Sequence, residues 1–64
     1  MDIEPQRHLT PQELADRLSV PLSSVYGWRA RHTGPLGMRV GKHVRYRIED
    51  VLAWEAQLVE RAVA

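Results

Sequence analysis

Basic side chains gather in the middle of this 64-residue chain. Residues 17–48 carry seven Lys and Arg side chains and no acid, whereas residues 1–16 and 49–64 each have a net charge of −3. Duplex DNA carries one negative charge per about 1.7 Å of its axis, and proteins that bind it present clustered cations. The pattern therefore predicts nucleic-acid binding, and the alternative is an ordinary solvated surface.

The candidate DNA-binding residues fall into two groups. The first lies on a predicted helix that starts at residue 22, and its small, polar and basic side chains are Ser23, Ser24, Tyr26, Gly27, Arg29 and Arg31. Small side chains let a helix approach base edges in the major groove, where we expect Tyr26 and Arg29 to be the specific readers. The second group lies on a predicted hairpin and consists of Arg39, Lys42, His43, Arg45 and Arg47. We expect Lys42, at the hairpin tip, to probe the DNA backbone or the minor groove.

Other chemistries lack the residues that they require. The chain has no cysteine, which excludes disulfides and thiolate metal sites. His8, His32 and His43 do not have the spacing of metal ligands, and no nucleophile has a positioned base. We therefore expect no metal, no cofactor and no catalytic residue, and we predict that the chain is not an enzyme.

Two short helices must carry the first group of candidate residues. Residues 10–13 have the sequence of a capping box with a proline at the first helical position, which predicts a helix over 11–18. Pro21 ends the following turn, because it removes a backbone donor and disfavours the helical region for the residue before it. A second helix follows at once, with an apolar inner face made of Leu22, Val25 and Trp28. Two helices joined by such a turn form a helix-turn-helix, whose second helix enters the major groove.

A β-hairpin is predicted over residues 38–48, because apolar and basic residues alternate on both sides of the tip Gly41-Lys42-His43. We expect one face to pack on the helices, and its residues are Met38, Val40, Val44, Tyr46 and Ile48. We expect the other face to point outward, and its residues are Arg39, Arg45 and Arg47. Trp28 and Tyr46 are predicted to lie in the core rather than on DNA.

A third helix is predicted over residues 49–61, because Glu49 and Asp50 suit the positive end of a helix dipole. Its wide apolar face consists of Val51, Trp54 and Leu58 with a neighbouring stripe of Leu52, Ala56 and Val59. Part of this face exceeds what a small core needs. Leu58, Val59 and Val63 either pack on another copy of the protein or belong to a frayed terminus.

The predicted fold class is α+β, mainly α, with three helices and a two-stranded hairpin between the second and the third. A chain of this length forms one domain, which we expect to cover residues 9–64 after a flexible arm over residues 1–8. No apolar run is long enough to span a membrane, and the N-terminus lacks the pattern of a signal peptide. We therefore expect a cytoplasmic protein.

Five segments together resemble the small MerR-like winged helix-turn-helix proteins, and among these most closely the excisionases, the recombination directionality factors of phages and integrative elements. The segments are 9–15, 18–21, 25–29, 39–46 and 50–54. Two residues depart from the family pattern: Ser19 stands where such turns usually carry glycine, and Pro21 where a Ser or Thr cap is common. The resemblance implies that Ser23, Ser24, Tyr26 and Arg29 enter the major groove, with Lys42 and Arg45 along the wing.

The resemblance also implies a biological role in a bacterial host cell, where we expect the protein to be associated with the nucleoid when it is bound to DNA. Excisionases of this type are expected to bind repeated sites cooperatively, with other copies on adjacent DNA, to bend the DNA and to favour excision by a partner integrase. Larger MerR-type regulators add a dimerisation helix and an effector-binding region, which the chain does not reach, so we expect no small-molecule effector. The alternative is a small MerR-like transcriptional regulator that binds promoter DNA, because fold and surface do not fix function.

Overall fold

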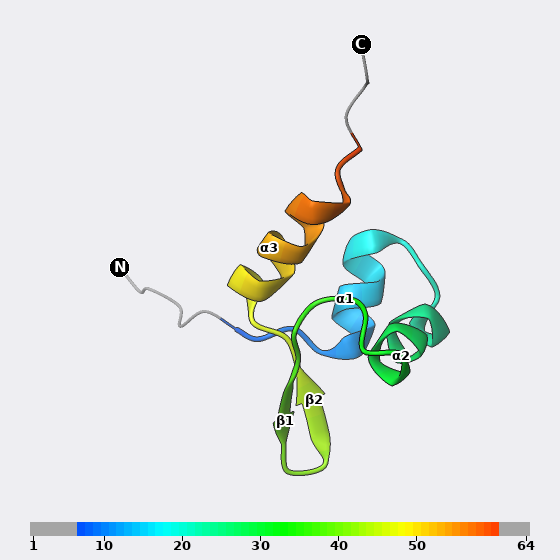
Figure 1. The fold of residues 1–64 in the computed structure, drawn as a ribbon. Coiled ribbons are helices and arrows are strands. Elements are labelled where there is room, and N and C mark those ends of the chain that lie inside the picture. Colours follow the sequence, from blue (N-terminus) through cyan, green and yellow to red (C-terminus); the bar gives the residue numbers. More distant parts are fainter. Residues whose placement is uncertain (1–6, 61–64) are drawn as a thin grey trace.

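The structure is a computed structural model, and it describes residues 7–60. Its elements are α1 (Pro11–Leu18), α2 (Leu22–Ala30), β1 (Met38–Val40), β2 (His43–Arg45) and α3 (Ile48–Leu58). Figure 1 shows the two strands as a hairpin that extends away from the helices, with α3 on the opposite side of the molecule. Within the described residues, three helices with an antiparallel hairpin between the second and third form a winged helix-turn-helix, so the predicted fold class is confirmed. The predicted arm over 1–8 lies outside the described residues, except for Arg7 and His8.

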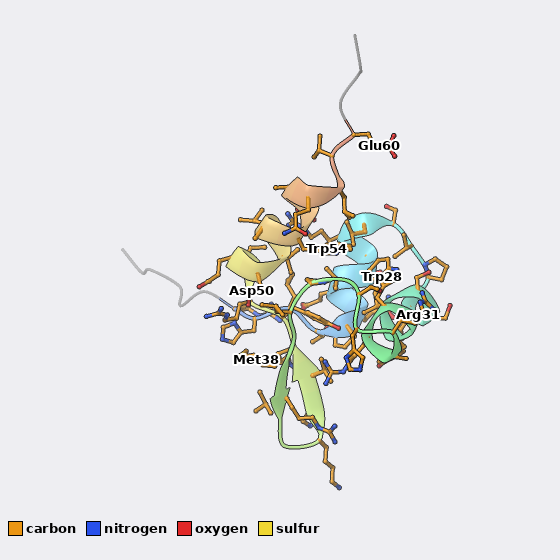
Figure 2. The ribbon with its side chains drawn as sticks, in the orientation of Figure 1. Trp28, Arg31, Met38, Asp50, Trp54 and Glu60 are labelled. Carbon is orange, nitrogen blue, oxygen red and sulfur yellow. The ribbon has the colours of Figure 1, made fainter. Side chains whose placement is uncertain are left out.

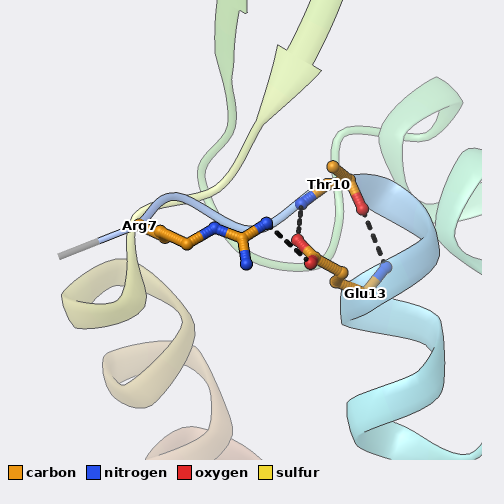
Figure 3. A network of polar contacts seen from close by, with 3 residues as sticks. All are labelled: Arg7, Thr10 and Glu13. Carbon is orange, nitrogen blue, oxygen red and sulfur yellow. Dashed lines mark hydrogen bonds and ion pairs between the residues drawn. The ribbon is translucent and has the colours of Figure 1, made fainter. Parts of the chain in front are cut away.

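A capping box holds the first turn of α1. The Thr10 hydroxyl accepts a hydrogen bond from the backbone N–H of Glu13 at 3.0 Å, and the Glu13 carboxylate accepts one from the N–H of Thr10 at 2.9 Å. Arg7 donates to the other carboxylate oxygen of Glu13 at 3.1 Å (Figure 3). Pro11 occupies the first turn, where its missing N–H costs no hydrogen bond. The predicted start of this helix is confirmed.

The turn between α1 and α2 depends on a left-handed residue. Ser19, the C-cap of α1, has φ 57° and ψ 45°, a region that disfavours any side chain. The N–H of Val20 donates to the carbonyl of Ala15 at 3.0 Å and closes the end of the helix. After Pro21, α2 begins at Leu22 without a side-chain cap. Ser19 therefore takes the conformation that a glycine adopts freely, and α2 begins at the predicted residue.

A small core joins the three helices to the end of the hairpin. Its fully buried members are Leu14, Ala15, Val25, Tyr46 and Val51. Half-buried side chains pack around them, namely Leu9, Leu18, Val20, Trp28, Val44 and Ile48. Trp28 from α2 meets Trp54 from α3, with ring centroids 5.1 Å apart (Figure 2). The predicted core positions of Trp28 and Tyr46 are confirmed.

The register of the hairpin, residues 38–45, which we call the wing, differs from the prediction. Its tip is a turn of two residues, Gly41 and Lys42, with Gly41 at φ 60°. The cross-strand partners are Met38 with Arg45, Arg39 with Val44, and Val40 with His43. A shift of one residue turns the other face of a strand toward its neighbours, and cross-strand partners share a face.

This register overturns the predicted division of the wing into an apolar and a basic face. Val44 packs on the core, whereas Val40 is 54% exposed, so the expectation that Val40 faces the helices was wrong. Met38 was predicted on the same face as Val44, which was also wrong, because it shares its face with Arg45. Arg39 and Arg45 therefore lie on opposite faces of the wing and not on a common outward one.

The last helix is shorter than predicted. α3 begins at Ile48, which was predicted to belong to the hairpin, and it ends at Leu58 rather than at residue 61, with an extended backbone at Val59. Residue 61 and Val63 lie outside the described residues. Val51 is buried in the core, whereas Leu52 and Leu58 are 51% and 54% exposed, so part of the apolar face is surplus to this core, as expected. Even α3, the longest helix among residues 7–60, lacks the length and apolar character needed to cross a membrane.

Candidate nucleic-acid interface

The outer face of α2 and its C-cap carry the first group of predicted DNA contacts. The exposed members are Ser23, Tyr26 and Arg31, and the half-buried ones are Ser24, Gly27 and Arg29. The Arg31 guanidinium folds back over Gly27, where an added Cβ would lie 3.4 Å from two of its nitrogens. Two serines and a glycine keep this stretch of helix backbone near the surface, as approach to base edges requires.

The wing carries the second group except Arg47, which was predicted on the hairpin but is the N-cap residue of α3. Lys42, Arg39 and His43 are exposed at and beside the tip, and Arg45 is half-buried. Arg39 Nε donates to the Gly41 carbonyl at 3.3 Å, and Arg45 Nη1 donates to the Val44 carbonyl at 2.8 Å. Both guanidinium groups therefore lie along the backbone of the wing. The wing has a cation on each face and one at the tip, an arrangement suited to a strand pair that enters or straddles a groove.

Two of the seven Lys and Arg side chains of residues 17–48 form ion pairs with acidic side chains. Arg17 Nε and Nη2 lie 2.7 Å and 2.9 Å from the Glu55 carboxylate oxygens. Arg47 Nε and Nη2 lie 2.7 Å and 3.0 Å from the oxygens of Asp50, and Arg47 Nη1 lies 3.5 Å from Glu49. Within residues 7–60 no ion pair involves the other five, which are Arg29, Arg31, Arg39, Lys42 and Arg45. These five all belong to α2, its C-cap and the wing.

The matched region of the chain decides its family. Residues 9–58 match a family model described as a helix-turn-helix domain. The chain belongs to this family. It is a family of DNA-binding domains found in excisionase-like proteins. No curated protein and no solved structure matches the chain significantly.

The family places α2 in a defined role. In helix-turn-helix domains the second helix lies in the major groove, while the first crosses the DNA backbone. In this helix-turn-helix domain the second helix is α2, and the match also includes both strands of the wing and all of α3. The chain is therefore a DNA-binding domain, and the individual contact residues stay a prediction.

The ion pairs Arg17–Glu55 and Arg47–Asp50 are charged at neutral pH. Hydrogen bonds from Arg17 hold the pKa of Glu55 below its ordinary value, and hydrogen bonds from Arg47 do the same for the pKa of Asp50. Arg47 is also the N-cap residue of α3. This predicted DNA contact therefore already has a structural role, because its side chain is bound to Asp50 in the first turn of the helix. The spacing of Arg47 and Asp50 is readable in the sequence, whereas Arg17 and Glu55 are 38 residues apart and only the fold brings them together.

Sequence reasoning missed Gly37 as a residue of the site. An added Cβ at Gly37 would lie 3.0 Å from Arg29 Nη1 and 3.1 Å from Tyr46 Cε1. Arg29 therefore reaches from α2 to the root of the wing. The only signal in the sequence is a glycine between a loop and a strand, and an ordinary turn explains that glycine equally well.

Proposed function

We propose that this helix-turn-helix protein is an excisionase, an architectural factor that binds repeated DNA sites cooperatively, bends the DNA and directs integrase-mediated excision. The observation that carries the DNA-binding part is the separation of the cations. Arg17 and Arg47 are paired with acids, while the five cations without an ion pair in the described residues lie on α2, its C-cap and the wing. Membership of a family found in excisionase-like proteins supports the finer role.

The two elements have different tasks in this proposal. Tyr26 and Arg29 on α2 read base edges in the major groove, and Ser23 and Ser24 allow the close approach. Lys42, with Arg39 and Arg45, contacts phosphates or the minor groove through the wing. Tyr26 is 52% exposed although it is a large aromatic side chain, which supports a contact surface there.

Cooperative binding requires that neighbouring copies touch. Leu52 and Leu58 on α3 are about half exposed and Val59 is 67% exposed, while the predicted DNA contacts lie on α2 and the wing. We propose that copies on adjacent sites meet through this part of the protein. The contacts of α2 and the wing with DNA then determine where each copy binds, and apolar contacts between neighbouring copies make the binding cooperative.

The decisive experiment is reconstituted excision with an integrase and attachment-site DNA from the same genetic element. We expect the wild-type protein to raise the yield of excised product and to shift circularly permuted fragments as a DNA-bending protein does. Lys42→Ala should weaken both effects, because it removes one of the five cations without an ion pair in the described residues. Arg7→Ala, which also removes one cation but lies outside the predicted contacts, should keep them. Unchanged excision, together with repression or activation of a promoter reporter, would favour the transcriptional regulator instead.

A further inference from the structure

Arg29 stands in the last turn of α2, where the helix meets the root of the wing. The backbone of Gly37 lies against both its guanidinium and the Tyr46 ring, since an added Cβ would lie 3.0 Å from Arg29 Nη1 and 3.1 Å from Tyr46 Cε1. Tyr46 is itself fixed, because its side chain is 2% exposed and its backbone exchanges two hydrogen bonds of 2.8 Å with Leu9. The guanidinium therefore lies close to a buried and hydrogen-bonded part of the fold.

The charge of Arg29 is not neutralised at this place. Within residues 7–60 no carboxylate forms an ion pair with it. Both the guanidinium and the Tyr46 ring lie beside Gly37. Burial raises the pKa of the Tyr46 hydroxyl, and the positive charge of the neighbouring Arg29 lowers it less strongly. Arg29 also lines a hollow of about 230 Å³ together with residues 32–37. The neutral residues Gly37 and Tyr46 lie beside the guanidinium, and its charge is open to an outside acceptor.

We propose that Gly37 and Tyr46 are positioning residues that set base discrimination by holding the Arg29 guanidinium ready for a guanine edge. A planar guanidinium reads O6 and N7 of guanine through two parallel hydrogen bonds, so its orientation decides the discrimination. A long side chain that is already ordered in the free protein loses less rotamer freedom on binding. This inference rests on the proposed sequence-specific DNA binding and adds two residues that need not touch DNA.

Gly37→Ala is the direct test. The glycines with positive φ among the described residues are Gly34 and Gly41, so the backbone conformation of Gly37 suits alanine. The new methyl group would lie 3.0 Å from the flexible end of Arg29 and 3.1 Å from the Tyr46 ring, so the guanidinium moves away and the ring yields slightly. The probes are a 20-bp duplex of the sequence that wild-type protein selects from a random pool and a scrambled duplex of equal length. We expect the ratio of the two affinities to fall about 5- to 100-fold, the value of a good bidentate base contact. The affinity for the scrambled duplex should stay within about twofold, because phosphate contacts are unchanged.

A double-mutant cycle separates positioning from general damage. In an Arg29→Ala background, Gly37→Ala should cost no further discrimination, because the group that it displaces is absent. Arg29→Lys, which keeps the charge but loses the planar fork, should lose discrimination like Gly37→Ala. Tyr46→Phe, which keeps the ring but loses the hydroxyl, should lose it in the same direction. Leu36→Ala, in the same loop with a side chain that is 73% exposed, is the matched control and should discriminate like wild type.

The outcomes distinguish this inference from the proposed function. If wild-type protein selects no sequence from the pool, sequence-specific binding itself is wrong. If wild type discriminates and a folded Gly37→Ala variant discriminates equally well, the positioning role alone is overturned. Equal losses from Gly37→Ala with and without Arg29 also overturn it, because the glycine then acts through something else. Circular dichroism and the melting temperature of each variant establish that it is folded.

Discussion

Arg17 on α1 and Glu55 on α3 form a two-pronged ion pair, with Nε and Nη2 at 2.7 Å and 2.9 Å from the two carboxylate oxygens. The two residues are 38 positions apart in the sequence, and their ion pair connects α1 to α3. Neither helix carries a residue of the two predicted groups of DNA contacts. Arg47 and Asp50 form a similar pair at the start of α3. The acids near the C-terminal end of the described chain therefore bind the two central arginines that lie outside α2 and the wing.

These pairs predict how stability depends on pH. The folded-state pKa of Glu55 and of Asp50 is lowered below the ordinary values of 4.5 and 3.8, chiefly by hydrogen bonds from Arg17 and Arg47. The stabilisation is therefore present above the ordinary values and is lost as the pH falls through the lowered ones. We expect the melting temperature of wild type to fall below about pH 5.

Glu55→Gln provides the comparison. This variant removes the titrating group, so its melting temperature should start lower at pH 7 and fall less steeply in acid. Glu60→Gln, which changes an acid that has no ion pair within residues 7–60, is the control and should follow wild type. The assignment fails if Glu55→Gln and wild type lose stability in parallel on acidification.

Ser19→Gly should stabilise the protein. Ser19 has φ 57° in the turn between α1 and α2, where a side chain costs free energy and glycine does not. We expect a gain of about 0.5–1 kcal/mol in the free energy of unfolding, measured by urea denaturation. Ser19→Ala keeps a Cβ in the same conformation and should bring no such gain. An equal gain from both substitutions would point to the loss of the hydroxyl and not to backbone strain.

The starts of the first two helices could be predicted from local sequence signals. The capping box of Thr10 and Glu13 fixes the start of α1, and Pro21 fixes the start of α2, because each acts through the backbone of a few neighbouring residues. The end of α3 has no such signal. No glycine or proline follows Leu58, so the apolar pattern continues where the structure offers no core to pack against.

The wing shows why alternation alone does not fix a site. The alternation of apolar and basic residues predicts a hairpin correctly, but the faces depend on whether the tip has two or three residues. With Gly41 and Lys42 as the tip, Arg39 pairs with Val44 across the strands, and the arginines divide between two faces. Arg29 and Gly37 show the same limit, because their contact arises from the packing of α2 on the root of the wing.

The observed register can be tested with two matched substitutions. Val44 packs on the core and Val40 is 54% exposed, although both are valines in the same hairpin. Val44→Ala should lower the free energy of unfolding by about 1 kcal/mol, because it removes apolar surface from a half-buried site. Val40→Ala should stay within about 0.5 kcal/mol of wild type. Losses of equal size would support the three-residue tip, in which both valines face the helices.

The salt dependence of the affinity for DNA should report how many cations contact phosphates. Each phosphate neutralised on duplex DNA contributes about −0.9 to the slope of log K against log[salt]. Arg17 and Arg47 are paired with acids, so the five cations on α2, its C-cap and the wing set a slope of about −4.5, or about −3.6 if Arg29 contacts a base instead. Lys42→Ala should reduce the magnitude of the slope by about 0.9, and Arg7→Ala should leave it unchanged. A slope that is unchanged by Lys42→Ala would show that DNA contacts a different set of cations. A wild-type slope near about −6 would show that Arg17 and Arg47, which are bound to Glu55 and Asp50, also contact phosphates.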